Sequence, residues 1–70
     1  MPIEQSSPSL TRTIEGWKVE LRFNNQTFAR YYHYKKDAVA FMNELTATIE
    51  RYGSMFHPEM LHMYKEERND

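Results

Sequence analysis

Hydrophobic and polar residues alternate most regularly over residues 17–23, WKVELRF. In an extended chain, successive side chains point to opposite sides. One side therefore carries Trp17, Val19, Leu21 and Phe23, and the other carries Lys18, Glu20 and Arg22. This pattern predicts a strand with one face in a core and the other in solvent.

The neighbouring segments predict two more strands. Residues 10–15, LTRTIE, are rich in β-branched side chains and end before Gly16, which indicates a shorter strand and a turn. Asn24 and Asn25 follow the alternating segment, and asparagine tolerates the left-handed backbone of tight hairpin turns. We expect the chain to reverse there and to return as a strand over residues 27–34.

The returning segment, TFARYYHY, alternates less cleanly. We assign to its core face Phe28, Tyr32 and Tyr34. Arg30 falls on the same side, so we expect it either to reach past the sheet edge or to be displaced by a bulge near the turn. Tyr31 and His33 are left on the outward side.

From residue 36 to residue 52, apolar residues recur at steps of three and four, which predicts an amphipathic helix. Its buried stripe would comprise Ala38, Phe41, Met42, Leu45, Ile49 and Tyr52. Asp37 suits the positive end of the helix dipole, and Gly53 is placed to cap the last turn. Because the helix stripe and the strand face can cover each other, we expect an α+β fold with a three-stranded antiparallel β-meander packed by one amphipathic α-helix.

Pro58 is suited to the first position of a second, short helix near the C-terminus, which would give the order β-β-β-α-α. The chain then divides into a flexible N-terminal lead-in over residues 1–9, a single core domain over residues 10–53, and a short C-terminal helix and tail over residues 54–70.

The composition narrows the chemistry that this chain can perform. Its 70 residues include no cysteine and two glycines, which excludes a disulfide framework, a thiolate zinc site and a glycine-rich phosphate loop. No serine lies in a GxSxG motif, and so small a domain has little room for a cleft that excludes water. We expect no catalytic residues, no cofactor and no enzymatic activity.

The histidines do not form a recognisable metal motif. His57 and His62 are five residues apart, which is wrong for a shared helix face, and Glu59 with His62 would supply only two ligands. We expect no metal site, and we expect His57 to cap the segment that begins at Pro58. No apolar run is long enough to span a membrane and no signal peptide is evident, so we expect a cytoplasmic protein without a membrane partner.

Charge is unevenly distributed along the chain, although the formal net charge is only -1. Residues 12–37 carry six basic and three acidic side chains, whereas residues 38–70 carry three basic and six acidic ones. The first half can attract anions, and the candidate binding residues on its strands are Arg12, Lys18, Arg22, Arg30, Tyr31 and His33. Such a set could hold phosphates or stack on bases, although Glu20 interrupts it.

The C-terminal segment offers a second candidate surface. Three of the five methionines lie there, and methionine adapts to irregular partner surfaces. The candidate residues for a partner or homodimer contact are Met55, Phe56, Met60, Met63 and Tyr64. The alternative is that this segment covers an exposed end of the protein's own core.

One stretch resembles a known family. In residues 16–45, Trp17 begins a strand, Tyr34 precedes the polar stretch KKDA, and Phe41 follows in the helix. This arrangement resembles the three-strand-plus-helix DNA-binding domains of the AP2 type, including the arm-binding domains of phage and transposon integrases. The resemblance implies the same fold, and it implies DNA contacts at Arg12, Lys18, Arg22, Arg30 and Tyr31.

Two functions therefore stay open at this point. The first is a small protein-interaction module, such as an adaptor, a regulator or a phage-like inhibitor of a host protein. It is favoured by the near-zero net charge and by the clustered tyrosines, arginines and methionines, which protein interfaces prefer. The alternative is a DNA- or RNA-binding accessory protein that uses the outer face of the sheet.

Overall fold

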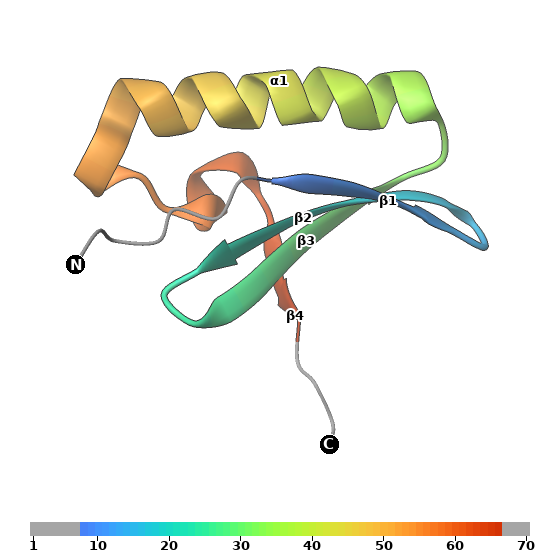
Figure 1. Cartoon of the computed structure of the whole chain (residues 1–70), viewed down its shortest axis with the longest axis horizontal. Helices are drawn as coiled ribbons and strands as arrows, with labels where there is room; N and C mark the ends of the chain where they lie inside the picture. The colour runs from blue at the N-terminus through green and yellow to red at the C-terminus, as the bar shows by residue number, and fades with distance from the viewer. Residues whose placement is uncertain (1–7, 67–70) are drawn as a thin grey trace.

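A four-stranded antiparallel sheet and one long helix make up the fold (Figure 1). The computed structural model describes residues 8–66. The strands are β1 (Ser9–Thr13), β2 (Gly16–Phe23), β3 (Gln26–Tyr32) and β4 (Tyr64–Glu66), in the spatial order β1-β2-β3-β4. Helix α1 (Lys35–Tyr52) lies across one face of the sheet (Figure 1). The α+β class is confirmed, but the prediction of three strands misses β4.

The N-terminal half follows the predicted meander. Val19 and Leu21 are buried and lie opposite Arg30 and Phe28 of β3. The β2–β3 turn uses Asn24 and Asn25, whose φ angles are 50° and 62°. Two successive left-handed residues are typical of the tight turns that match strand twist, so the asparagine prediction is confirmed. Residues 1–7 of the lead-in predicted for residues 1–9 lie outside the described residues. Ser9, at its end, already belongs to β1.

Arg30 takes neither of the two predicted positions. The pairing of β2 with β3 runs from Trp17 opposite Tyr32 to Phe23 opposite Gln26 without a bulge. Arg30 therefore faces the helix, and its guanidinium lies 5.0 Å from the ring centre of Phe41. One of its NH groups donates a 3.0 Å hydrogen bond to the carbonyl of Leu61. A planar cation can be half-buried in this way because aromatic faces and a carbonyl replace part of its hydration.

Helix α1 begins one residue before the predicted start and ends where predicted. Ala38, Phe41 and Leu45 are buried against the sheet. Gly53 has φ 53° and donates its NH to the carbonyl of Ile49, so its role as C-terminal cap is confirmed. Tyr34 was assigned to the core, but it stands at the N-cap of the helix with 62% of its surface exposed. The strand has ended by that residue, so strand alternation no longer decides where its ring points.

The predicted second α-helix does not form. Two short 3-10 turns, η1 (Gly53–Met55) and η2 (Pro58–Leu61), lead instead into β4. Pro58 is at the start of η2 as predicted, and His57 caps it, since its Nδ1 accepts a hydrogen bond from the NH of Glu59 at 3.1 Å. This compact turn returns the chain to the free edge of β3, where Ala29 pairs with Tyr64 and Thr27 with Glu66.

The C-terminal segment supplies part of the core. Phe56 and Met63 are buried in the same cluster as Val19 and Phe28. The ring of Phe56 meets that of Phe23 edge to face, with 6.0 Å between the centres. The core therefore extends beyond the helix and meander, to residues on both sides of η2.

Candidate functional site

The sheet has one face that no described helix or strand covers. Because side chains alternate along each strand, the residues that point away from α1 can be read from the pairing register. We call this surface the outer face. It comprises Ser9, Thr11 and Thr13 of β1, Lys18, Glu20 and Arg22 of β2, Thr27, Ala29 and Tyr31 of β3, and Tyr64 and Glu66 of β4.

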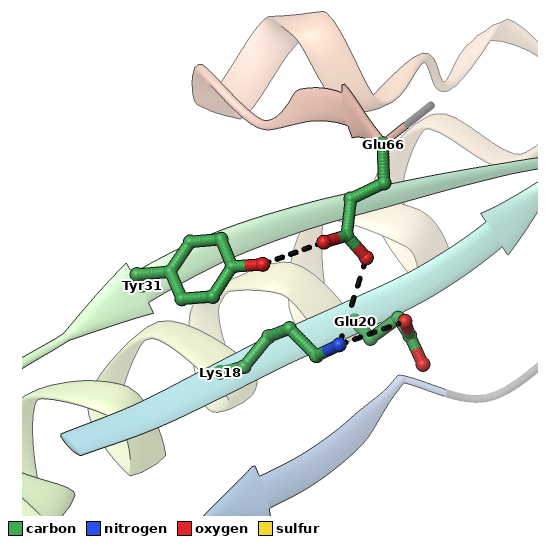
Figure 2. Close-up of polar contacts among 4 residues, drawn as sticks. All are labelled: Lys18, Glu20, Tyr31 and Glu66. Carbon is green, nitrogen blue, oxygen red and sulfur yellow. Dashed lines mark hydrogen bonds and ion pairs between the residues drawn. The ribbon is translucent and has the colours of Figure 1, made fainter. Parts of the chain in front are cut away.

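Four of these side chains form a hydrogen-bonded and ionic network, which we call the outer-face network (Figure 2). Lys18 Nζ lies 3.3 Å from Glu20 Oε2 and 3.6 Å from Glu66 Oε1. The hydroxyl of Tyr31 donates to Glu66 Oε2 at 2.5 Å. Glu66 therefore ties β4 to both β3 and β2, and the network joins three strands.

The network shifts the proton affinities of its members. The hydrogen bond from Tyr31, helped by the charge of Lys18, lowers the pKa of Glu66 although partial burial opposes the shift. The same hydrogen bond, with burial, raises the pKa of the Tyr31 hydroxyl. Burial alone would lower the pKa of Lys18, but the hydrogen bond and charge of Glu20 and the charge of Glu66 outweigh it, and the pKa is raised. The shifts of Lys18 and Glu66 favour the ionic form of this pair, and the shift of Tyr31 keeps its hydroxyl protonated as a hydrogen-bond donor.

The fold separates the six predicted binding residues into different places. Lys18, Arg22 and Tyr31 share the outer face as predicted. Arg12 lies opposite Trp17 and Arg30 opposite Val19, so both project toward the helix side. His33 is exposed in the loop after β3, where its ring meets Tyr34 edge to face.

Glu20 and Glu66 change the electrostatics expected for the outer face. Glu20 was interpreted as a defect in a basic patch, but it is an ionic partner of Lys18. Glu66 falls within the short C-terminal helix and tail predicted for residues 54–70, and it reaches the sheet only because β4 pairs with β3. No local sequence signal pointed to it, since three residues without apolar alternation do not indicate a strand.

A different part of the molecule brings two cations to one aromatic ring. Lys35 Nζ lies 5.3 Å from the ring centre of Trp17, and the guanidinium of Arg12 lies 5.8 Å from the same centre. Within residues 8–66, neither cation has a carboxylate partner. Trp17 was predicted as a core residue, and its half-buried ring is also the surface on which these two cations stack.

The predicted methionine-rich surface is divided between core and solvent. Phe56 and Met63 are buried, whereas Met55, Met60 and Tyr64 are exposed. Met60 and Leu61 of η2 line a shallow groove beside the last turns of α1, together with Glu44, Ala47, Thr48, Arg51 and Tyr52. The exposed residues remain candidates for partner contact.

Among the described residues, no three histidine, aspartate or glutamate side chains lie close enough together to hold a metal ion. In the same part of the chain, no helix combines the length and apolar character needed to cross a membrane.

Comparisons with protein-family models, with curated proteins and with solved structures found no match for this chain. The resemblance to AP2-type and integrase arm-binding domains therefore stays a prediction from the sequence.

Proposed function

We propose that this chain is a non-enzymatic protein-interaction module, an adaptor, regulator or inhibitor, that contacts a partner protein through the outer face. The observation that carries the proposal is the exposure of two tyrosines on an otherwise uncovered sheet. Tyr31 is 57% and Tyr64 71% exposed, and both project from neighbouring strands on the same side. Tyrosine supplies large contact area at low entropic cost and is enriched at binding hot spots.

The charges of the outer face support a protein partner over a nucleic acid. Nucleic-acid affinity depends strongly on cations that can neutralise phosphates. Lys18 is held between Glu20 and Glu66, so a phosphate would have to compete with two carboxylates for it. Arg12 and Arg30, which a DNA-binding sheet would need on this face, point to the other side.

A capture experiment with matched tyrosine variants tests the proposal. The immobilised chain should retain a protein from an extract of its source cells, and the contact should be mapped by cross-linking to the outer face. Tyr64→Ala should weaken binding of the purified partner by about tenfold or more, the loss typical of an aromatic hot spot. Tyr34→Ala is the control, since Tyr34 is comparably exposed but lies off the sheet. Equal binding by the two variants would contradict the choice of surface.

A nucleic-acid titration separates the two functions. Mobility-shift assays with duplex DNA and RNA at low salt should show no binding that depends on Arg22. Binding that weakens steeply with salt and is lost in Arg22→Gln would favour the nucleic-acid alternative instead.

Self-association is a second use of exposed apolar side chains that can be tested directly. Met55 and Met60 are the exposed methionines of the C-terminal segment. If they form a homodimer contact, light scattering should give twice the monomer mass, and Met55→Ser with Met60→Ser should restore the monomer. A monomer at all concentrations would leave the outer face as the proposed contact.

A further inference from the structure

Strand β1 is an edge strand of the sheet that residues 8–66 form. It pairs with β2 on one side, and no strand of residues 8–66 pairs with its other side. Such an edge presents main-chain NH and C=O groups to which an extended chain can add as a further strand. Its five residues, SLTRT, are long enough to pair with a short peptide.

The side chains beside this edge define what such a strand would meet. Leu10 and Arg12 project to the helix side, opposite Val19 and Trp17. Arg12 and Lys35 stack on the same indole ring, Arg12 from β1 and Lys35 from the first turn of α1. Both are exposed. A peptide residue placed opposite Arg12 would therefore lie next to the Arg12 guanidinium, with Lys35 stacked on the same indole ring.

The contrast with Lys18 shows which cations are open to a ligand. Lys18 is occupied by Glu20 and Glu66 of its own chain. Arg12 and Lys35 stack on an aromatic ring and, in the described part of the chain, form no ion pair with a carboxylate. An incoming carboxylate could therefore interact with these cations without displacing an ionic partner of the described residues.

We propose that the β1 edge binds an extended acidic segment of a partner protein, which adds to the sheet beside β1 and places a carboxylate at Arg12 and Lys35. The residue opposite Leu10, two positions from the carboxylate, should be apolar because it continues the core face. Arg12 also disfavours basic strands at this edge, so one residue promotes the acidic partner and discourages partners of the opposite charge. This surface is separate from the outer face and does not depend on the function proposed for it.

Trp17 provides a built-in reporter, because it is the only tryptophan of the chain. The probe is the peptide acetyl-Thr-Glu-Thr-Val-Thr-Glu-Thr-amide, whose pattern reads the same in both directions and so fits parallel or antiparallel pairing. Titration at low salt should change Trp17 fluorescence with saturation. Replacing both glutamates of the peptide by glutamine should weaken binding by about tenfold, and added salt should weaken binding of the acidic peptide.

Variants of the protein assign the charge contacts. Arg12→Gln and Lys35→Gln should each weaken binding of the acidic peptide by about fivefold, and neither should affect binding of the glutamine peptide. Arg51→Gln is the matched control: Arg51 stacks on Tyr52 at 5.8 Å, the distance that separates Arg12 from Trp17, but it lies in the last turn of α1. This control should bind like the parent chain.

N-methylated peptides test the addition of a strand separately from charge. Alternate residues of a strand direct their NH groups to opposite neighbours. One peptide is methylated on residues 1, 3, 5 and 7 and the other on residues 2, 4 and 6. The peptide that loses the NH groups directed at β1 should not bind, and the peptide that loses the NH groups directed away from β1 should bind. Equal binding by both would overturn strand addition.

Two further outcomes would overturn the proposal as a whole. The first is unchanged binding of the acidic peptide by Arg12→Gln and Lys35→Gln. The second is an oligothymidylate that binds more tightly than the acidic peptide and displaces it, since the cations and Trp17 would then form a nucleic-acid contact.

Discussion

Replacing Met63 by alanine should remove a large part of the stability of this protein. Met63 is 3% exposed and packs in the core cluster with Phe28 and Phe56, just before β4. Truncating a buried methionine to alanine costs about 2–5 kcal/mol, because apolar contacts are lost and a cavity remains. A chain of this length should have a total stability of about 4–10 kcal/mol. The midpoint of thermal unfolding should therefore fall by about 10 °C or more.

The matched control is Met55→Ala, the same substitution in the same segment. Met55 is 79% exposed, so its truncation should change the free energy of unfolding by less than about 0.5 kcal/mol. Urea unfolding followed by Trp17 fluorescence measures both variants, with m-values checked for a common unfolding reaction. Equal and small effects of the two substitutions would refute the assignment of the C-terminal segment to the core, and with it the docking of β4.

Three other tests address the network and the turns. A double-mutant cycle of Tyr31→Phe and Glu66→Gln should give a coupling of about 0.5–1 kcal/mol, because the hydrogen bond is strong but near solvent; additive effects would contradict the contact. Since the pKa of Glu66 is lowered in the folded chain, its contribution should be complete above pH 4.5 and be lost as the pH falls through the folded value. The stability gap between the parent chain and Glu66→Gln should accordingly narrow in acid, and a gap that widens there would disagree with this sign. Gly16→Ala should cost more than about 2 kcal/mol, since its Cβ would lie 2.2 Å from the carbonyl oxygen of Tyr32. Gly53→Ala has open space around the new Cβ, but φ 53° with ψ -124° is a backbone conformation that residues other than glycine rarely adopt, so it should cost about 1–3 kcal/mol. Thermal unfolding measures both variants.

Local patterns predicted the parts of the fold that local interactions determine. The alternation over residues 17–23, the Asn24 and Asn25 turn and the helix capped by Gly53 were all visible in the sequence, and all are present. Each depends on side-chain periodicity or on the backbone preference of one residue type. These signals depend on a few neighbouring positions, so they can be recognised in a single sequence.

The pairing of β4 could not be predicted in that way. Tyr64–Glu66 is too short to show alternation, and its strand geometry comes from the hydrogen bonds that β3 offers. The methionines before it fit a helix and a turn equally well. Glu66, which completes the outer-face network, was missed for the same reason.

Register decided the positions of the arginines. Arg12 and Arg30 were grouped with Lys18 as candidates for one surface, because their charge suggested a common role. Pairing with Trp17 and Val19 sends both to the helix side, where aromatic rings receive them. A charged side chain on an apolar strand face is thus accommodated by stacking, and no bulge is needed to remove it.

The place of β4 in the sheet has a kinetic consequence. Strands β1, β2 and β3 are joined by two-residue turns, so forming the meander closes only short loops. The pairing of β3 with β4, in which Ala29 lies opposite Tyr64, closes a loop that contains the whole of α1. Because long loops close late in folding, we expect an intermediate in which the meander has formed and the far edge of β3 is still open. In a nascent chain that edge stays unpaired until residue 66 has left the ribosome. During that interval the open edge of β3 can pair with a strand of another copy of the chain. This risk ends when β4 pairs with β3 and Tyr31 donates its hydrogen bond to Glu66.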